Sequence, residues 1–389
     1  MHFYTSITTC YLPKARVLVE TLKKHNPDAI MHLVMADDLP EGFNLKEELF
    51  DYVWHAEDFI RTKNNKQWFY EHTVVELCTA IKPAAAIHIF RNTDADEIVF
   101  LDPDIAVYGN LDELHERLQR NSLLITPHQV DPAISENGVR DEEICSLKYG
   151  VFNFGFFAVR RNEEGFRFLN WWNSRLMNYC YDDIPNGLFT DQKWGNLIPC
   201  FFDFCHILRG VEYNVATWNL ATRKITGNSK TGWFVNDRPL KFFHFTGFDS
   251  GAHRIMLSQH AKPGEPAWEL SIQYENWLFE NGQKELGKVP YKFSCYKNGE
   301  KILKRERILF RQSVELKKQF NDPFSEECLY WMKKNFTQIN IKAFSFIYFV
   351  SYILSKVTFG KMRTKYRLMV KRYRKIKDEM TRLTGGGYL

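Results

Sequence analysis

The sequence contains no hydrophobic run long enough to cross a membrane, no closely paired cysteines and no internal repeat. Its most apolar stretch, residues 343–354, is well short of the ~20 residues that a transmembrane helix requires. The eight cysteines show no Cys-x-x-Cys spacing, and the chain opens directly on an apolar segment, which argues against structural zinc, a disulfide framework and a signal peptide. We therefore expect a protein of the reducing cytoplasm.

Glycine and proline are also few, at 21 and 14 of 389 residues, which excludes collagen-like and low-complexity classes. A net positive charge is absent from most of the chain. Residues 361–389 carry ten lysines and arginines against two acidic residues, so the net charge of +5 divides into +8 in this segment and −3 in the remainder. A body without a broad basic surface is unsuited to binding nucleic acid, whereas a cationic end suits an anionic membrane surface.

The residues that are abundant can build a sizeable core, since 44% are hydrophobic and 15% aromatic. Short apolar runs alternate with segments of helical periodicity, which predicts an α/β fold with a mostly parallel, doubly wound sheet. In such sheets ligands bind beyond the carboxyl ends of the strands, where residues 5–11, Asp37 and residues 102–104 fall. The expected strands are 2–7, 30–36, 51–54 and 97–101, and the expected helices are 13–25, 73–90 and 166–177.

The pattern divides the chain into three parts. Residues 1–265 form the main domain, which includes further apolar runs at 152–159 and 240–245, and residues 266–335 are expected to add a helix and a hairpin packed on it. In residues 336–389, apolar positions at alternating spacings of four and three lie among basic ones, which predicts an amphipathic basic helix. Docking on a membrane surface is the favoured interpretation. Self-association into a homo-oligomer, or a solvated or core-packed helix, are the alternatives.

Asp102 and Asp104 flank a proline at the end of an apolar run. If the strand continues, side chains two residues apart project to the same face, so the two carboxylates converge and can hold Mn²⁺ or Mg²⁺. His244 ends another apolar run, and an imidazole beside the carboxylates would favour Mn²⁺. Gly247 permits the close backbone approach that a phosphate requires. Taken singly, Asp-Pro-Asp is more often a turn and the histidine a core residue, so their combination suggests the metal site.

Four segments occur in the order and spacing seen in glycosyltransferase family 8 and related bacterial enzymes of the GT-A fold. They are Phe-Leu-Asp-Pro-Asp at 100–104, Phe-Asn-Phe-Gly-Phe at 152–156, Asp-Gln at 191–192 and His-Phe-Thr-Gly at 244–247. The resemblance covers roughly residues 1–265. Residues 213–220 with Arg223 are more similar to enzymes of bacterial cell-surface polysaccharide synthesis than to the glycogenin branch.

The resemblance implies roles for individual residues. Asp102, Asp104 and His244 would be metal ligands, and Asn153 would lie at the donor sugar together with the catalytic pair Asp191 and Gln192. Tyr11 matches an aromatic that stacks on the nucleobase and Lys82 a helix cation that reaches the donor, although a half-buried aromatic and a solvated charge are simpler explanations. The donor-binding set comprises Thr5, Tyr11, Asp37, Lys82, Asp102, Asn153, Trp218, Asn219, Arg223 and Gly247.

The chain departs from the family pattern in two places. Residues 5–8, Thr-Ser-Ile-Thr, stand where the family commonly has an aspartate, and residues 248–250, Phe-Asp-Ser, stand where it has Lys-Pro-Trp. That family lysine contacts the diphosphate, so another donor has to assist the metal here. Arg223, His253 and Arg254 are the candidates.

The expected function is transfer of a hexose, with retention of configuration, from a UDP-sugar to a glycan or lipid-linked acceptor. The resemblance and the basic tail suggest bacterial O-antigen, capsule or lipooligosaccharide synthesis by a peripheral enzyme at the inner face of the cell membrane. Two other classes remain open. One is a nucleotidyltransferase that makes nucleotide sugars, although these usually open with a Gly-rich, basic loop that residues 5–11 lack. The other is a non-catalytic glycan- or membrane-binding protein of the same fold.

Overall fold

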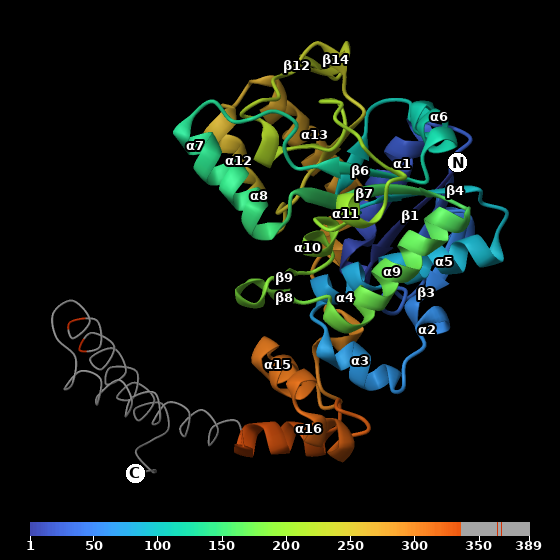
Figure 1. Cartoon of the computed structure of the whole chain (residues 1–389), viewed down its shortest axis with the longest axis vertical. Coiled ribbons are helices and arrows are strands. Elements are labelled where there is room, and N and C mark those ends of the chain that lie inside the picture. The colour runs from blue at the N-terminus through green and yellow to red at the C-terminus, as the bar shows by residue number, and fades with distance from the viewer. Residues whose placement is uncertain (336–363, 365–366, 368–389) are drawn as a thin grey trace. The chain divides into compact units, whose positions relative to one another are not determined.

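The computed structural model describes residues 1–335 together with Thr364 and Arg367. The chain forms two compact units, Met1–Ser294 and Cys295–Leu389 (Figure 1). This division lies further along the chain than residue 265, because helix α13 (Pro266–Glu280) packs its apolar face into the core of the first unit. The tail predicted to dock on a membrane falls almost entirely outside the described residues.

Seven strands form the central sheet of the first unit: β1 (His2–Ile7), β2 (Ile30–Met35), β3 (Tyr52–His55), β4 (Glu97–Leu101), β6 (Leu123–Pro127), β7 (Phe152–Arg160) and β10 (Cys205–Ile207). Their order is β10-β6-β7-β4-β1-β2-β3 (Figure 1). Strand β7 runs antiparallel to its neighbours β4 and β6, and the other neighbouring pairs are parallel. The predicted α/β fold with a mostly parallel sheet is confirmed.

Helices cover both faces of this sheet. On one face, α1 (Leu12–His25) and α6 (Asp112–Arg120) pack against alternate residues of the central strands, among them Phe3, Val99 and Phe156. On the other lie α4 (Val74–Ala80), α5 (Lys82–Asn92) and α9 (Glu163–Tyr179), which contact one another (Figure 1). The single helix expected over residues 73–90 is two helices, α4 and α5, because Pro83 has no amide hydrogen to continue the ladder of α4.

The first unit also contains two three-stranded sheets, besides the two-stranded pair β8-β9. One has the order β11-β15-β5 and consists of β11 (Val215–Ala216), β15 (Phe242–His244) and β5 (Ile105–Val107). The other is the antiparallel meander β12-β13-β14, formed by Ile225–Asn228, Gly232–Val235 and Arg238–Pro239. The remaining short elements are α2 (Ala56–Phe59), α3 (Asn65–Glu71), α7 (Glu136–Gly138), α8 (Ile144–Tyr149), β8 (Asp182–Asp183), β9 (Leu188–Phe189), α10 (Gln192–Gly195), α11 (Ile198–Phe201), α12 (Ala252–His260) and α14 (Gln283–Leu286).

The second unit, as far as it is described, contains α15 (Lys304–Gln312) and α16 (Val314–Gln319). The hairpin expected within residues 266–335 reduces to one bridge between Cys295 and Lys301, around a turn in which Gly299 has a φ of +86°. Residues 292–294, just before this bridge, form a 3₁₀ helix. Within the described residues, no helix combines the length and apolar character needed to cross a membrane.

Candidate metal and donor site

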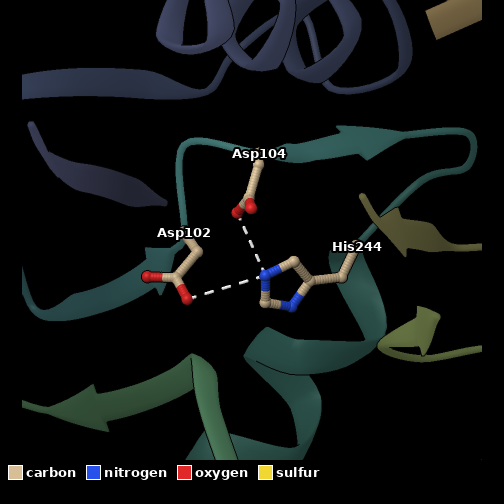
Figure 2. Close-up of side chains that lie close together, drawn as sticks. All are labelled: Asp102, Asp104 and His244. Atoms are coloured by element: carbon tan, nitrogen blue, oxygen red, sulfur yellow. Dashed lines mark ion pairs between the residues drawn. The ribbon is translucent and has the colours of Figure 1, made fainter. Parts of the chain in front are cut away.

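Two carboxylates lie in the turn that joins the central sheet to the first small sheet. Asp102 and Asp104 separate β4 from β5, and the amide of Ile105 donates to the carbonyl of Asp102 at 3.1 Å. The two side chains converge as the sequence predicts (Figure 2), but they do so across the turn between β4 and β5, which contains Pro103, and not along one continuous strand. Their side chains are 26% and 14% exposed, so both can reach a ligand.

The third group is His244, the last residue of β15. Its Nε2 lies 3.0 Å from Oδ1 of Asp104 and 3.7 Å from Oδ2 of Asp102 (Figure 2). Because β15 pairs with β5, His244 stands opposite Ile105, and the amide of Phe245 donates to the carbonyl of Asp104 at 2.8 Å. Ligand atoms of the two aspartates and the histidine lie within 4.8 Å of one another. This donor set fits a divalent metal ion.

Burial and mutual attraction set the charges of these three groups. Burial alone would lower the pKa of His244, but the charge and hydrogen bond of Asp104 outweigh it and raise that pKa. Burial would raise the pKa of Asp104, yet the attraction to His244 lowers it. Burial does raise the pKa of Asp102, against the pull of Lys82. A divalent cation bound here would take the place of the proton that His244 shares with the carboxylates.

Asn214 holds the other ring nitrogen of His244. The two face each other at 3.2 Å between Nδ1 and Asn214 Oδ1, while Asn214 Nδ2 donates to Thr126 Oγ1 at 2.9 Å and to Asn153 Oδ1 at 3.0 Å. A proton on Nδ1 directed at the asparagine would leave Nε2 to bind a metal ion in place of its contact with Asp104. Asn214 has a φ of +50°, an uncommon conformation that asparagine tolerates. Its role was not predicted, although it lies within a segment of the family resemblance.

Gly155 in β7 lies directly against the ring of His244. A Cβ at this position would come within 2.4 Å of His244 Cε1 and 2.7 Å of Asn153 Oδ1. Real Cβ atoms essentially never approach other atoms so closely. The glycine of Phe-Asn-Phe-Gly-Phe is therefore needed to make room for the histidine.

Lys82, the first residue of α5, lies between the turn with Asp102 and two other segments of the family resemblance, residues 152–156 and 191–192. Its Nζ lies 2.9 Å from Asp191 Oδ2, 3.2 Å from Asp102 Oδ1 and 2.9 Å from the carbonyl oxygen of Phe154. The side chain is 3% exposed, so the prediction of a helix cation at the site is favoured over a solvated charge. Although burial opposes it, the attraction of the two carboxylates raises the pKa of Lys82 and keeps it charged.

The residues assigned to the donor sugar lie side by side. Asn153 Nδ2 is 3.4 Å from Gln192 Oε1, and Asn153 Oδ1 accepts from the amide of Gly155 at 2.9 Å. Asp191 is 3% exposed and accepts from Thr190 Oγ1 at 3.2 Å. Because β7 is antiparallel, its first residues share an edge of the sheet with the carboxyl ends of β4 and β6.

Three residues of the 213–223 segment serve different purposes. Trp218 packs its ring edge on His244, with centroids 5.1 Å apart. Asn219 is fully buried and holds the local turn by accepting from the amide of Ala216 at 3.0 Å. Arg223, 2% exposed, donates to the carbonyl of Tyr213 at 2.7 Å. The structure therefore places Trp218 at the cluster, whereas Asn219 and Arg223 have backbone partners.

Thr5 was predicted to contact the donor beyond the carboxyl end of the first strand. It instead lies inside β1, which continues to Ile7, and it is fully buried. Asp37, just beyond β2, accepts from the amide of Thr9 at 3.0 Å, and burial raises its pKa to about 6. Tyr11 is partly buried, and the ammonium of Lys14 lies 3.8 Å from its ring centroid. Lys14 was not among the predicted residues.

After His244 the chain turns at Gly247, which has a φ of +71° that favours glycine. The two remaining candidates for the diphosphate cation have other partners. His253 is buried with Nε2 3.0 Å from Ser271 Oγ, and burial lowers its pKa to about 4, so it is neutral. Arg254 pairs with Glu275 at 3.2 Å.

No protein-family model matches the chain. Among curated proteins it is similar to YfnD of Bacillus subtilis (strain 168), with 23% identity over 256 residues, 64% of this chain and 78% of that protein. A second protein of that organism, YfnF, is 23% identical over 175 residues, 44% of this chain and 57% of that protein. Both are described only as uncharacterized proteins.

Several solved structures to which the chain is similar are glycosyltransferases. They include the galactosyltransferase LgtC, with 15% identity, a TM-score of 0.41 and coverage of 75% of this chain and 98% of that one. The glycosyltransferase GlyE of Streptococcus pneumoniae TIGR4 has 18% identity and a TM-score of 0.39, covering 76% and 66%. Mouse xyloside xylosyltransferase 1 has 16% identity and a TM-score of 0.38, covering 64% and 98%.

Proposed function

We propose that this protein is a metal-dependent glycosyltransferase of the GT-A fold that takes a hexose from a nucleotide-diphosphate sugar. The observation that carries the proposal is the convergence of Asp102, Asp104 and His244 from two sheets, with ligand atoms within 4.8 Å of one another. The four motifs shared with glycosyltransferase family 8 support the same assignment.

The metal ligands would hold Mn²⁺ in preference to Mg²⁺, because imidazole is a poorer ligand for Mg²⁺. Once bound, the ion would neutralise the negative charge that develops on the departing diphosphate. Asn214 keeps His244 in the orientation that presents Nε2, and Gly155 leaves the space for its ring.

Around the donor sugar, Asp191 would accept hydrogen bonds from hydroxyl groups, and Lys82 fixes the direction of its carboxylate. Gln192 is only partly buried and would face the positively charged anomeric carbon of the transition state with its amide oxygen. Asn153 positions that amide at 3.4 Å. Retention of configuration, with the departing phosphate accepting the acceptor's proton, is proposed from the family resemblance.

The acceptor is proposed to be a glycan or lipid-linked intermediate of bacterial surface-polysaccharide synthesis. The +8 charge of residues 361–389 supports work at the anionic inner face of the cell membrane. Removal of residues 340–389 tests this location without touching the metal site.

The activity is tested by measuring UDP or GDP release from a panel of nucleotide sugars with Mn²⁺ or Mg²⁺. EDTA should abolish release, and Asp104→Ala should lower kcat/KM by about 100-fold or more. Asp28→Ala is a matched control, because Asp28 is exposed in the turn before β2, at the opposite edge of the sheet. Full turnover by the chelated enzyme or by Asp104→Ala would refute the metal assignment.

A further inference from the structure

Lys14 is a buried lysine that was not among the residues predicted to form the site. Lys14 is in the first turn of α1 and is 1% exposed, with its ammonium over the ring of Tyr11 and paired with Asp249. A cation in the first turn of a helix is unfavourable, because the helix N-terminus itself carries partial positive charge, and this first turn contains no acidic residue. Burial adds to the cost. The position therefore demands an anion.

The anion present comes from the turn after the metal ligand His244. Asp249 lies between Gly247 and Gly251, whose φ values are +71° and +76°. Its side chain is 40% exposed, and its second oxygen accepts from Gln283 Nε2 at 3.3 Å. Asp249 can therefore return to water at little cost, whereas Lys14 cannot be left unpaired.

The ion pair with Asp249 joins Lys14 to the turn that follows the metal ligand His244, five residues beyond that histidine. Lys82, by contrast, contacts Asp102 itself. The arginines and histidine expected to replace the missing family lysine have other partners, namely the carbonyl of Tyr213 for Arg223, Ser271 for His253 and Glu275 for Arg254. Lys14 instead contacts both Tyr11 and the turn after Gly247.

We propose that Lys14 is the cation that binds the diphosphate of the donor, and that Asp249 occupies it until the nucleotide arrives. The inference rests on the proposed use of a nucleotide-diphosphate donor. The exchange replaces one anion with another, so the buried ammonium is never uncompensated. Helix α1 thus supplies the cation that is absent from the turn after Gly247. The turn itself carries Asp249, which competes with the diphosphate for Lys14.

The test is the affinity of the full-length protein, with Mn²⁺, for UDP and GDP by calorimetry. Lys14→Gln should weaken binding of the preferred diphosphate by about 10- to 100-fold, the value of a charge-assisted hydrogen bond. Binding of the corresponding nucleoside should not change, because it carries no phosphate. Lys14→Arg should restore most of the diphosphate affinity.

Asp249→Asn should act in the opposite direction and tighten diphosphate binding, because the competing carboxylate is lost. Weaker binding in both Lys14→Gln and Asp249→Asn would mean that the pair acts as one structural unit, and would overturn the proposal. So would an equal loss of nucleoside affinity in Lys14→Gln. If the unaltered protein binds neither UDP nor GDP, the proposed function fails as well; if it binds one and Lys14→Gln binds it equally, only the role of Lys14 fails.

Discussion

Replacing Gly155 by alanine should weaken metal binding although the substitution changes none of the proposed metal ligands. The new Cβ would lie 2.4 Å from Cε1 of His244. Because carbon atoms in contact remain about 3.5–4.0 Å apart, the ring has to retreat by about 1 Å. Metal–ligand distances tolerate only about 0.2 Å, so the bond to Nε2 cannot survive this shift. The retreat would also disturb the 3.2 Å contact with Asn214.

We expect Gly155→Ala to weaken Mn²⁺ binding by about 10- to 100-fold. The loss should equal that of His244→Ala, and the double variant should lose no more, because both changes remove the same interaction. The overpacked core should cost about 1–3 kcal/mol of stability and leave the protein folded. Titration of Mn²⁺ against the electron paramagnetic resonance signal of the free ion measures the affinity, and urea unfolding measures the stability.

Gly42→Ala is the matched control. Gly42 has a φ of +77° and no atom within 4 Å of a Cβ built on it, so alanine there should cost about 1 kcal/mol through backbone strain alone. Its Mn²⁺ affinity should stay unchanged. Mn²⁺ affinity at the unaltered level in Gly155→Ala would show that His244 is not a ligand or that its ring has room to move, and the reasoning above would be wrong.

Three further outcomes are expected. Lys82→Met should lower the free energy of unfolding by about 3–5 kcal/mol, measured by urea unfolding at neutral pH, because the buried Asp191 and the partly buried Asp102 lose their shared partner. Burial raises the pKa of Glu142 to about 7 from an ordinary value of 4.5, so between these pH values the native state keeps a proton that the unfolded state has lost. The free energy of unfolding should therefore fall by about 3 kcal/mol as the pH rises from 4.5 to 7. Glu142→Gln should accordingly show a higher denaturant midpoint than the unaltered protein at pH 8 but not at pH 4. Removing residues 340–389 should abolish co-sedimentation with anionic vesicles and leave Mn²⁺ binding at the metal site intact. Unchanged co-sedimentation of the shortened protein would contradict the docking role.

The strands of the central sheet could be predicted because each is a short buried apolar run between turn residues. The predicted ranges 2–7 and 97–101 are the observed β1 and β4, the range 30–36 exceeds β2 by one residue, and the range 51–54 is shifted by one residue from β3. The edge at which the site lies followed from the alternation of strands and helices. Strand geometry did not explain the convergence of Asp102 and Asp104, because the chain turns between β4 and β5.

The contacts that build the site could not be predicted, because they join residues far apart in the sequence. Asn214 meets His244 only through the pairing of β11 with β15. Lys14 meets Asp249 across more than half of the chain, and no local pattern marks a lysine on α1 as buried. A positive φ at an asparagine leaves no signature in composition or periodicity either.

The pairing of β5 with β15 has a consequence for how this protein can vary. The histidine reaches the two aspartates because it stands opposite Ile105, so a shift of one residue in this short ladder would turn the imidazole to the other side of the sheet. Residues 108–241 lie between these two strands and include Gly155 and Asn214, which hold the ring of His244. A one-residue deletion next to β15 would therefore separate the imidazole from the two aspartates without altering any of the three side chains.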